Sequence, residues 1–214
     1  MTPLRAPAVE FYFEFSSPYA YFASERIETL CATWGLPLLW KPVMLGAIMK
    51  HTGQRPLFTD GVRGKYAVHD CLRWSRMNGI PFQVPDPHPV NSLQAARGAL
   101  VLEGNPARIP FIHACFRAYW ANGLDISRPA VIDRIVAKLG LDVPAFRDQI
   151  EDPAVKGMLK HATDAAWARG VFGTPTFVFG DEMLWGNDRL PVLEALAAEQ
   201  AANARVPELV GLPV

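Results

Sequence analysis

An alternating segment near the amino terminus leads directly into a helix start. From Val9 to Phe15, every odd position is apolar. This period of two predicts a strand with one face turned to the core. Ser17 and Pro18 follow at once, and a serine before a proline is typical of a helix N-cap and first turn. The opposite, more polar face of the strand is expected to carry Glu10, Tyr12 and Glu14.

The helix that begins at Pro18 is predicted to stop at Gly35, because its apolar residues recur at helical spacing up to that point and glycine favours a helix end. The segment Leu36–Val43 then has the composition of a second strand. The first 43 residues therefore predict a strand–helix–strand unit.

Strand signals return near the carboxyl end of the chain. Thr176–Phe179 and Met183–Trp185 flank Gly180 and Asp181, a pair typical of a tight hairpin turn. A last helix is expected to follow, with a stripe of leucines at 190, 193 and 196 and with Asn187 or Asp188 as its cap.

The middle of the chain, from about residue 60 to residue 169, shows only helical signals. Asn78-Gly79 and Asn122-Gly123 are predicted helix ends, and Ser127 and Asp142 are predicted helix caps. A further helix is expected over residues 153–170. The proline-rich segment Pro81–Val90 predicts a surface loop.

This order of elements predicts an α/β core interrupted by an all-helical insertion. The core is expected to comprise residues 8–45 and 170–205, and the insertion residues 46–169.

Composition narrows the classes of function. The chain has 214 residues, 21 Lys and Arg, and 21 Asp and Glu, so its formal net charge is zero. This balance argues against binding to nucleic acid or to an anionic membrane surface. No run of about 18 apolar residues suggests a membrane span, and the first residues lack the apolar core of a signal peptide. We expect a soluble, cytoplasmic protein.

The cysteines and histidines indicate neither a redox pair nor a metal site. Cys31, Cys71 and Cys115 are widely separated and form no C-x-x-C motif, which argues against a disulfide framework and against a dithiol centre. The five histidines show no H-E-x-x-H and no cysteine at zinc-ligand spacing. We therefore expect no metal.

Three segments have residues that suit ligand binding. Ser17 lies at a helix N-terminus, which stabilises anions, although a serine there is more often a simple cap. Thr174-Pro175 precedes a strand; a cis bond there would leave the Thr174 N–H and C=O free to pair with an extended peptide, whereas an ordinary proline would only mark the strand start. Asn187 and Asp188 either hold an amino group or cap the last helix.

Together these segments resemble one family. The stretches VEFYFEFSSPYAYFASERI, GVFGTPTFVFG and EMLWGNDRL are similar to those of the 2-hydroxychromene-2-carboxylate isomerases, which are relatives of kappa-class glutathione transferases and DsbA-type oxidoreductases. The resemblance covers nearly the whole chain. It implies a thioredoxin-like β-α-β … β-β-α fold with a helical insertion. Ser17 stands where thioredoxin-like redox enzymes carry a nucleophilic cysteine.

The resemblance also implies a cofactor and a reaction. Glutathione would supply the thiol that the motif lacks, and Ser17 and the helix N-terminus would lower the pKa of that thiol. Its thiolate would add reversibly to the substrate, so that a double bond becomes free to rotate. The implied reaction interconverts 2-hydroxychromene-2-carboxylate and trans-o-hydroxybenzylidenepyruvate, in a protein that relatives suggest is a homodimer. The implied glutathione-binding residues are Ser17, Thr174, Trp185, Gly186, Asn187 and Asp188.

The substrate, an aromatic keto acid, calls for a cation and hydrogen-bond donors near the insertion. Where the family usually has T-G-N before a proline, this chain has Gln54 and Arg55 after Thr52-Gly53, which moves the amide by one methylene. The candidate substrate-binding residues are Lys50, Gln54, Arg55, His88 and Asn91. Residues with helical spacing that are predicted to be structural are Tyr66, Asp70, Arg73 and Trp74.

Three alternatives remain open. A kappa-like glutathione transferase or peroxidase would share the glutathione site and differ in its acceptor. A non-catalytic peptide-binding module could use the same scaffold, because a fold does not determine a function. Thiol–disulfide exchange ranks last, because no cysteine stands at the first-helix position.

Overall fold

The computed structural model describes residues 7–59 and 61–205. Its sheet has the strand order β2-β1-β3-β4. Strand β1 pairs in parallel with β2 and antiparallel with β3, and β3 pairs antiparallel with β4. The strands are β1 (Val9–Phe13), β2 (Leu38–Pro42), β3 (Thr176–Phe179) and β4 (Glu182–Trp185).

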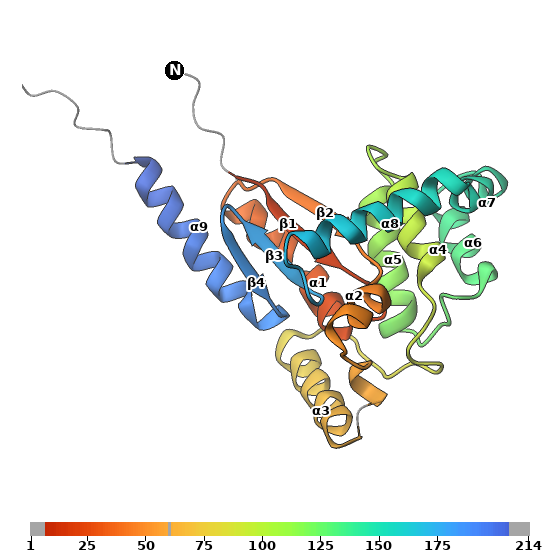
Figure 1. The fold of residues 1–214 in the computed structure, drawn as a ribbon, viewed down its shortest axis with the longest axis horizontal. Coiled ribbons are helices and arrows are strands. Elements are labelled where there is room, and N and C mark those ends of the chain that lie inside the picture. Colours follow the sequence, from red (N-terminus) through yellow and green to blue (C-terminus); the bar gives the residue numbers. More distant parts are fainter. Residues whose placement is uncertain (1–6, 60, 206–214) are drawn as a thin grey trace, which may run out of the picture.

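In Figure 1, α4, α5, α6 and α7 gather beyond the β2 edge of the sheet, α9 lies beside β4 at the other edge, and α3 projects away from the others. The helices are α1 (Pro18–Thr33), α2 (Leu45–Thr52), α3 (Gly61–Asn78), α4 (Leu93–Val101), α5 (Arg108–Trp120), α6 (Pro129–Lys138), α7 (Val143–Glu151), α8 (Pro153–Ala168) and α9 (Leu190–Arg205), with short 3₁₀ turns at η1 (Leu57–Thr59) and η2 (Asn187–Arg189).

The two faces of the sheet are covered by different helices. Phe11 and Phe13 of β1 belong to the main core together with Ile27 of α1 and Phe116 of α5. On the other face, a smaller cluster joins the sheet to α2 and α8; its buried members are Tyr12, Val43, Ile48, Ala166, Val171 and Val178. Because helices bury both faces, a sheet of four short strands supports an extensive hydrophobic core.

The predicted element order is confirmed, and several local signals act as expected. The Ser17 side chain caps α1, and Gly35 follows that helix with φ +63°. Asp142 caps α7 by accepting a hydrogen bond from the Ala145 N–H. Gly180 has φ +62° in the two-residue turn between β3 and β4, where a positive φ at the first turn position suits glycine.

The outer face predicted for the first strand is wrong in part. Both Tyr12 and Glu14 are buried: Tyr12 packs in the smaller cluster with α2 and α8, and Glu14 accepts hydrogen bonds from Ser16 and Ser92. The first two strands are also shorter than predicted. The helix α2, which begins directly after β2, was not predicted, because it carries no capping side chain.

Two predicted helix caps are wrong. Ser127 hydrogen-bonds to Asp125, and α6 starts one residue later, with Arg128 at the N-cap position and Pro129 in its first turn. Asn187 and Asp188 do not cap α9, because they form the η2 turn that precedes it. In both places the polar side chain belongs to a local turn and not to the helix N-terminus.

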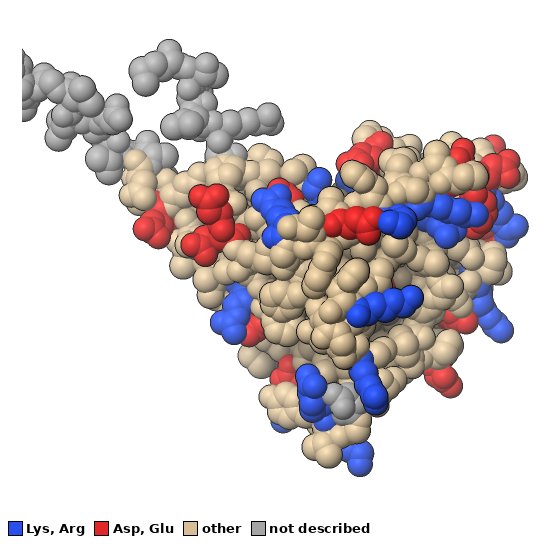
Figure 2. Space-filling model, in the orientation of Figure 1, with Lys and Arg blue, Asp and Glu red and all other residues tan. Residues whose placement is uncertain are grey.

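Charge is unevenly spread over the surface in the orientation of Figure 1. Figure 2 shows Lys and Arg gathered around α3, whereas both signs lie side by side over α8. Among the described residues, no helix has the length and apolar character that crossing a membrane requires.

Candidate functional site

A cleft of about 900 Å³ opens where β1 passes into α1. Its walls come from parts of the chain that are distant in sequence: residues 14–19, α2 and the segment after it, residues 88–93, the turn at 173–174, and the end of β4. The carboxyl end of a strand and the N-terminus of a helix thus meet in one concave site, which is a common location for ligands in α/β proteins.

Ser17 lies at the junction of these walls. Its Oγ accepts a hydrogen bond from the Ala20 N–H at 3.2 Å, which caps α1, and donates to the Thr174 carbonyl oxygen at 3.0 Å. The side chain lines the cleft although it is largely buried. A hydroxyl group and the N-terminus of a 16-residue helix therefore act at the same point, and both favour an anion.

Thr174 presents unpaired polar groups to the same cleft. The Thr174-Pro175 bond is cis. Within the described residues, the Thr174 N–H has no hydrogen-bond partner, and the buried Oγ1 has none either. The expectation that its C=O is also free is wrong, because that oxygen accepts the Ser17 hydroxyl. Unsatisfied buried donors are rare in native proteins, so these atoms point to a ligand.

The segment Trp185–Asp188 only partly reaches the cleft. Trp185 lines it and is 49% exposed, whereas Gly186, Asn187 and Asp188 do not line it. Asn187 is buried and its Nδ2 has no partner, and Asp188 pairs with Arg189 at 3.1 Å. Gly186 has φ +113°, a conformation that glycine allows, and its N–H donates to the Pro175 carbonyl.

The cleft is also lined by every residue suggested for the substrate. Lys50 lies in the last turn of α2, Gln54 and Arg55 follow that helix, and the other two come from the segment before α4. Arg63 of α3 also lines the cleft and was missed, because a charged residue at the start of a helix looks like ordinary surface. The five predicted residues that line the cleft are Lys50, Gln54, Arg55, His88 and Asn91.

His88 has one defined tautomer. The Tyr119 hydroxyl donates its only proton to the Pro87 carbonyl at 2.9 Å, so the His88 Nδ1, 2.9 Å from that hydroxyl, must be the donor between the two rings. The His88 Nε2 then remains an acceptor. Burial lowers the pKa of His88 to about 4, which keeps the ring neutral near pH 7.

Further cleft residues were not identified from the sequence. Glu14 is 5% exposed, and burial raises its pKa although hydrogen bonds from Ser16 and Ser92 act in the opposite direction. Its alternating position in the strand suggested an outward side chain. Tyr19 also lines the cleft, and its hydroxyl donates to Asp70 at 2.9 Å.

Of the four α3 residues predicted to be structural, two join α3 to α1, and Tyr66 and Arg73 contact each other within α3. Asp70 accepts the Tyr19 hydroxyl of α1, and Trp74 contacts the Arg26 guanidinium of the same helix, 5.6 Å from the ring centroid. Tyr66 is exposed, and its ring contacts only the Arg73 guanidinium in this way. The contacts of Asp70 and Trp74 hold α3 against α1 beside the cleft.

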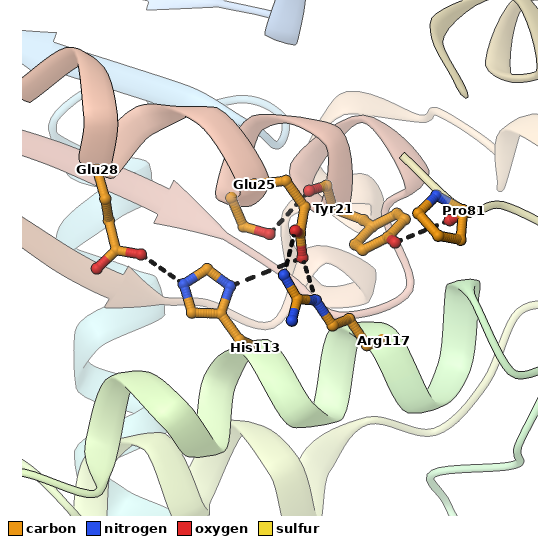
Figure 3. A network of polar contacts seen from close by, with 7 residues as sticks. Tyr21, Glu25, Glu28, Pro81, His113 and Arg117 are labelled. Atoms are coloured by element: carbon orange, nitrogen blue, oxygen red, sulfur yellow. Dashed lines mark hydrogen bonds and ion pairs between the residues drawn. The ribbon is translucent and has the colours of Figure 1, made fainter. Parts of the chain in front are cut away.

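The helix that carries Ser17 is also tied to α5 by a polar network. His113 Nε2 lies 2.6 Å from Glu28, and its Nδ1 lies 3.8 Å from Glu25. Arg117 makes two hydrogen bonds to Glu25, at 2.8 and 2.6 Å. Figure 3 shows His113 between the two carboxylates, with Arg117 one helical turn further along α5.

The three cysteines do not line the cleft, and all of them are buried. Burial raises the pKa of Cys31 and of Cys71 to about 12, and it raises that of Cys115 as well. Among the described residues, no cluster of His, Cys, Asp and Glu is arranged to hold a metal ion.

Comparison with known proteins agrees with this geometry. Residues 8–198 match the DSBA-like thioredoxin domain. The 2-hydroxychromene-2-carboxylate isomerase of Pseudomonas putida is 32% identical over 189 residues, which cover 87% of this chain and 92% of that protein. The chain belongs to the 2-hydroxychromene-2-carboxylate isomerase family. A solved structure of such an isomerase has a TM-score of 0.83 to this chain at 31% identity, covering 93% of this chain and 100% of that one.

The chain is also similar to kappa-class glutathione transferases. Human glutathione S-transferase kappa 1 is 27% identical over 219 residues, which cover 92% of this chain and 97% of that protein. The thioredoxin-like fold with helices between its two β-units is therefore that of this family.

Proposed function

We propose that this protein is a glutathione-dependent isomerase that interconverts 2-hydroxychromene-2-carboxylate and trans-o-hydroxybenzylidenepyruvate or a close analogue, as part of aromatic catabolism. The observation that carries the proposal is the cleft at the start of α1, where Ser17 occupies a helix N-terminus and no cysteine lines the walls. The name of the Pseudomonas putida relative supports the reaction, and that of the human relative supports glutathione.

The residues present fit a bound tripeptide. The Thr174 N–H and Oγ1 are without partners in the described structure, and both are donors that the backbone of an extended peptide can satisfy. Trp185, half-exposed beside them, adds apolar contact area. We assign the γ-glutamyl end to Trp185, Gly186, Asn187 and Asp188, where the unpaired Asn187 Nδ2 is a further donor.

When bound, glutathione supplies the thiolate that attacks the conjugated substrate. Ser17 and α1 make such a thiolate stable, because the helix N-terminus favours negative charge and the Ser17 hydroxyl can donate to it. In this structure that proton is donated to the Thr174 carbonyl at 3.0 Å, so the hydroxyl rotates about its Cβ–Oγ bond to donate to the thiolate instead.

Another part of the cleft lining suits the keto acid. Lys50 and Arg55 offer positive charge for a carboxylate, and Gln54 and Asn91 offer amide donors for the neighbouring oxygens. The neutral His88 offers an acceptor at Nε2, so it can accept a proton in the cleft without first losing one.

The test compares two reactions with the same protein. Turnover of 2-hydroxychromene-2-carboxylate should require glutathione, whereas conjugation of glutathione to an electrophilic aryl halide should be slow or absent. Conjugation without isomerisation would instead assign the protein to the kappa-like transferases. Ultraviolet titration of the bound thiol supplies a second measurement, since its pKa should be lower than that of free glutathione.

We also propose that the protein forms a homodimer and acts in the cytoplasm. Exposed apolar side chains on α3, with Val62 at 85% and Met77 at 77% exposure, offer a surface for a second copy. A reduced thiol cofactor is most available in the cytosol. Light scattering of the purified protein and detection in cell fractions test the two statements, and a monomeric mass would refute the first.

A further inference from the structure

A carboxylate that the proposed reaction does not use lies in the cleft wall. Glu14 directly follows β1 and is the one acidic residue among the described residues that line the cleft. Its Oε2 accepts hydrogen bonds from the Ser16 N–H at 2.9 Å and from the Ser16 hydroxyl, and its Oε1 accepts one from the Ser92 hydroxyl. No cation in the described chain is paired with it.

These bonds determine what the two serines can offer a ligand. Both serine hydroxyls donate to Glu14, so both of their protons point toward it. The oxygens of Ser16 and Ser92, which both line the cleft, therefore keep only lone pairs for other partners. This wall accepts hydrogen bonds and donates none from its hydroxyl groups.

The rest of the cleft has the opposite character. Lys50 and Arg55 lie on α2 and the segment after it, and both are donors with positive charge. A ligand carboxylate is attracted to them and finds no hydroxyl donor at Ser16 and Ser92. A ligand that carries a carboxylate at one end and an O–H group at the other is complementary to the two walls in one orientation only.

We propose that Glu14, acting through the hydroxyls of Ser16 and Ser92, makes this wall a receptor for the aromatic hydroxyl of the substrate and so orients the open-chain keto acid in the cleft. The carboxylate of the substrate then lies toward Lys50 and Arg55. This inference rests on the proposed function, whose substrate has both groups. Ser16 and Ser92 contact the ligand, and Glu14 is a positioning residue.

The test measures binding of two compounds without glutathione, so that turnover does not interfere. The first is o-hydroxybenzylidenepyruvate, the second is benzylidenepyruvate, which lacks only the ring hydroxyl, and quenching of tryptophan fluorescence reports the dissociation constants. A buried hydrogen bond to an acceptor whose own proton is held elsewhere predicts that the wild-type protein binds the hydroxyl compound roughly tenfold more tightly.

In Glu14→Gln, the amide accepts from one serine and donates to the other, so one hydroxyl proton turns away and the ratio of the two constants should fall toward one. The matched control is Glu10→Gln. Glu10 is on β1, the strand that Glu14 follows; it accepts hydrogen bonds from Tyr12 and Arg169 and does not line the cleft, so the wild-type ratio should persist.

Ser92→Ala provides a second variant. Ser92 precedes α4 but makes no capping hydrogen bond, so its loss removes an acceptor from the cleft without uncapping the helix. Its ratio should also fall.

A wild-type ratio near one overturns the proposal without any variant, as does failure to bind either compound. Folded Glu14→Gln and Ser92→Ala proteins that keep the wild-type ratio overturn it too. Failure of the proposed function looks different: the wild-type protein then prefers the hydroxyl compound but does not convert it when glutathione is added.

Discussion

At the scale of single residues, Ser17 joins two distant parts of the chain at the cleft. Its hydroxyl caps α1 through the Ala20 N–H and reaches the Thr174 carbonyl, 157 positions away in the sequence. The position of the helix N-terminus relative to the cis-proline turn is thereby set by one side chain. The helix N-terminus, which stabilises an anion, is thus in place before any ligand binds.

Replacing Ser17 by alanine should abolish most of the isomerisation while glutathione still binds, because Thr174 and Trp185 remain. The free energy of unfolding should fall by about 1 kcal/mol through loss of the cap. Turnover numbers, calorimetric binding and chemical denaturation measure the three effects.

The control for this prediction is Asp152→Ala, since Asp152 caps α8 by accepting from the Ala154 N–H at 2.7 Å, away from the cleft. It should cost similar stability and leave turnover unchanged. Unchanged turnover in Ser17→Ala would assign thiolate stabilisation to the helix alone, or would favour a binding module.

At the scale of secondary-structure elements, α1 is held by α5 through His113 and its two carboxylates. Burial alone would raise the pKa of Glu25, but His113 and Arg117 lower it to about 2. Burial alone would lower the pKa of His113, but Glu25 and Glu28 raise it above its usual value. Each charge thus stabilises the other in a half-buried network.

The raised pKa of His113 predicts that the network contributes less to stability as the pH rises. Its histidine contribution is complete below the unfolded-state pKa of about 6.5 and is lost as the pH rises through the higher folded-state pKa of His113. The melting temperature of the wild-type protein should therefore fall more between pH 6.5 and pH 9 than that of His113→Gln. The exposed His161 supplies the control, since His161→Gln should follow the wild-type curve. Parallel curves for wild type and His113→Gln would contradict the prediction.

Helix α4 packs tightly against two others at a glycine. A Cβ on Gly98 would lie 2.6 Å from the Phe146 ring and 2.7 Å from the Phe111 ring, which come from α7 and α5. Both rings are buried in the core, so they have little room to move.

Alanine at this position should therefore destabilise the protein by roughly 1–3 kcal/mol, although alanine is a better helix former than glycine. The matched variant is Gly157→Ala in α8, where nothing lies within 4 Å and the same change should stabilise by roughly 0.5–1 kcal/mol. Denaturant unfolding of both variants measures the pair. Two changes of the same sign would refute the packing argument.

At the scale of the whole molecule, the thiols of the chain are spread through the structure and are closed off from solvent. Cys31 lies on α1, Cys71 on α3 and Cys115 on α5, and all three are buried. Their raised pKa values leave little thiolate near neutral pH.

We therefore expect the native protein to be inert toward an aromatic disulfide reagent, and to show three reactive thiols only after unfolding. The protein should also fail to reduce insulin disulfides. Fast reaction of one thiol in the native state, together with disulfide reductase activity, would favour the thiol–disulfide exchange alternative.

Much of the element order was predictable because its signals are local. Alternation over Val9–Phe13, the Ser17-Pro18 helix start and the turn at Gly180 each depend on a few neighbouring residues. The expected caps at Ser127 and Asn187 failed because a polar side chain has several local partners, and the sequence does not rank them. The boundaries between core and insertion at residues 45–46 and 169–170 stay a prediction.

By itself, the sequence determined which elements form, the absence of a cysteine before Pro18, and the family resemblance that names a reaction. Only the tertiary structure decided which side chains share the cleft. It joined Ser17 to Thr174 and brought Lys50 and His88 to one site. It also buried Glu14 in hydrogen-bond contact with Ser92. The physical reason is that periodicity reports which side of an element is apolar, whereas a binding site depends on contacts between segments far apart in the chain, and those are set only when the helices pack on the sheet.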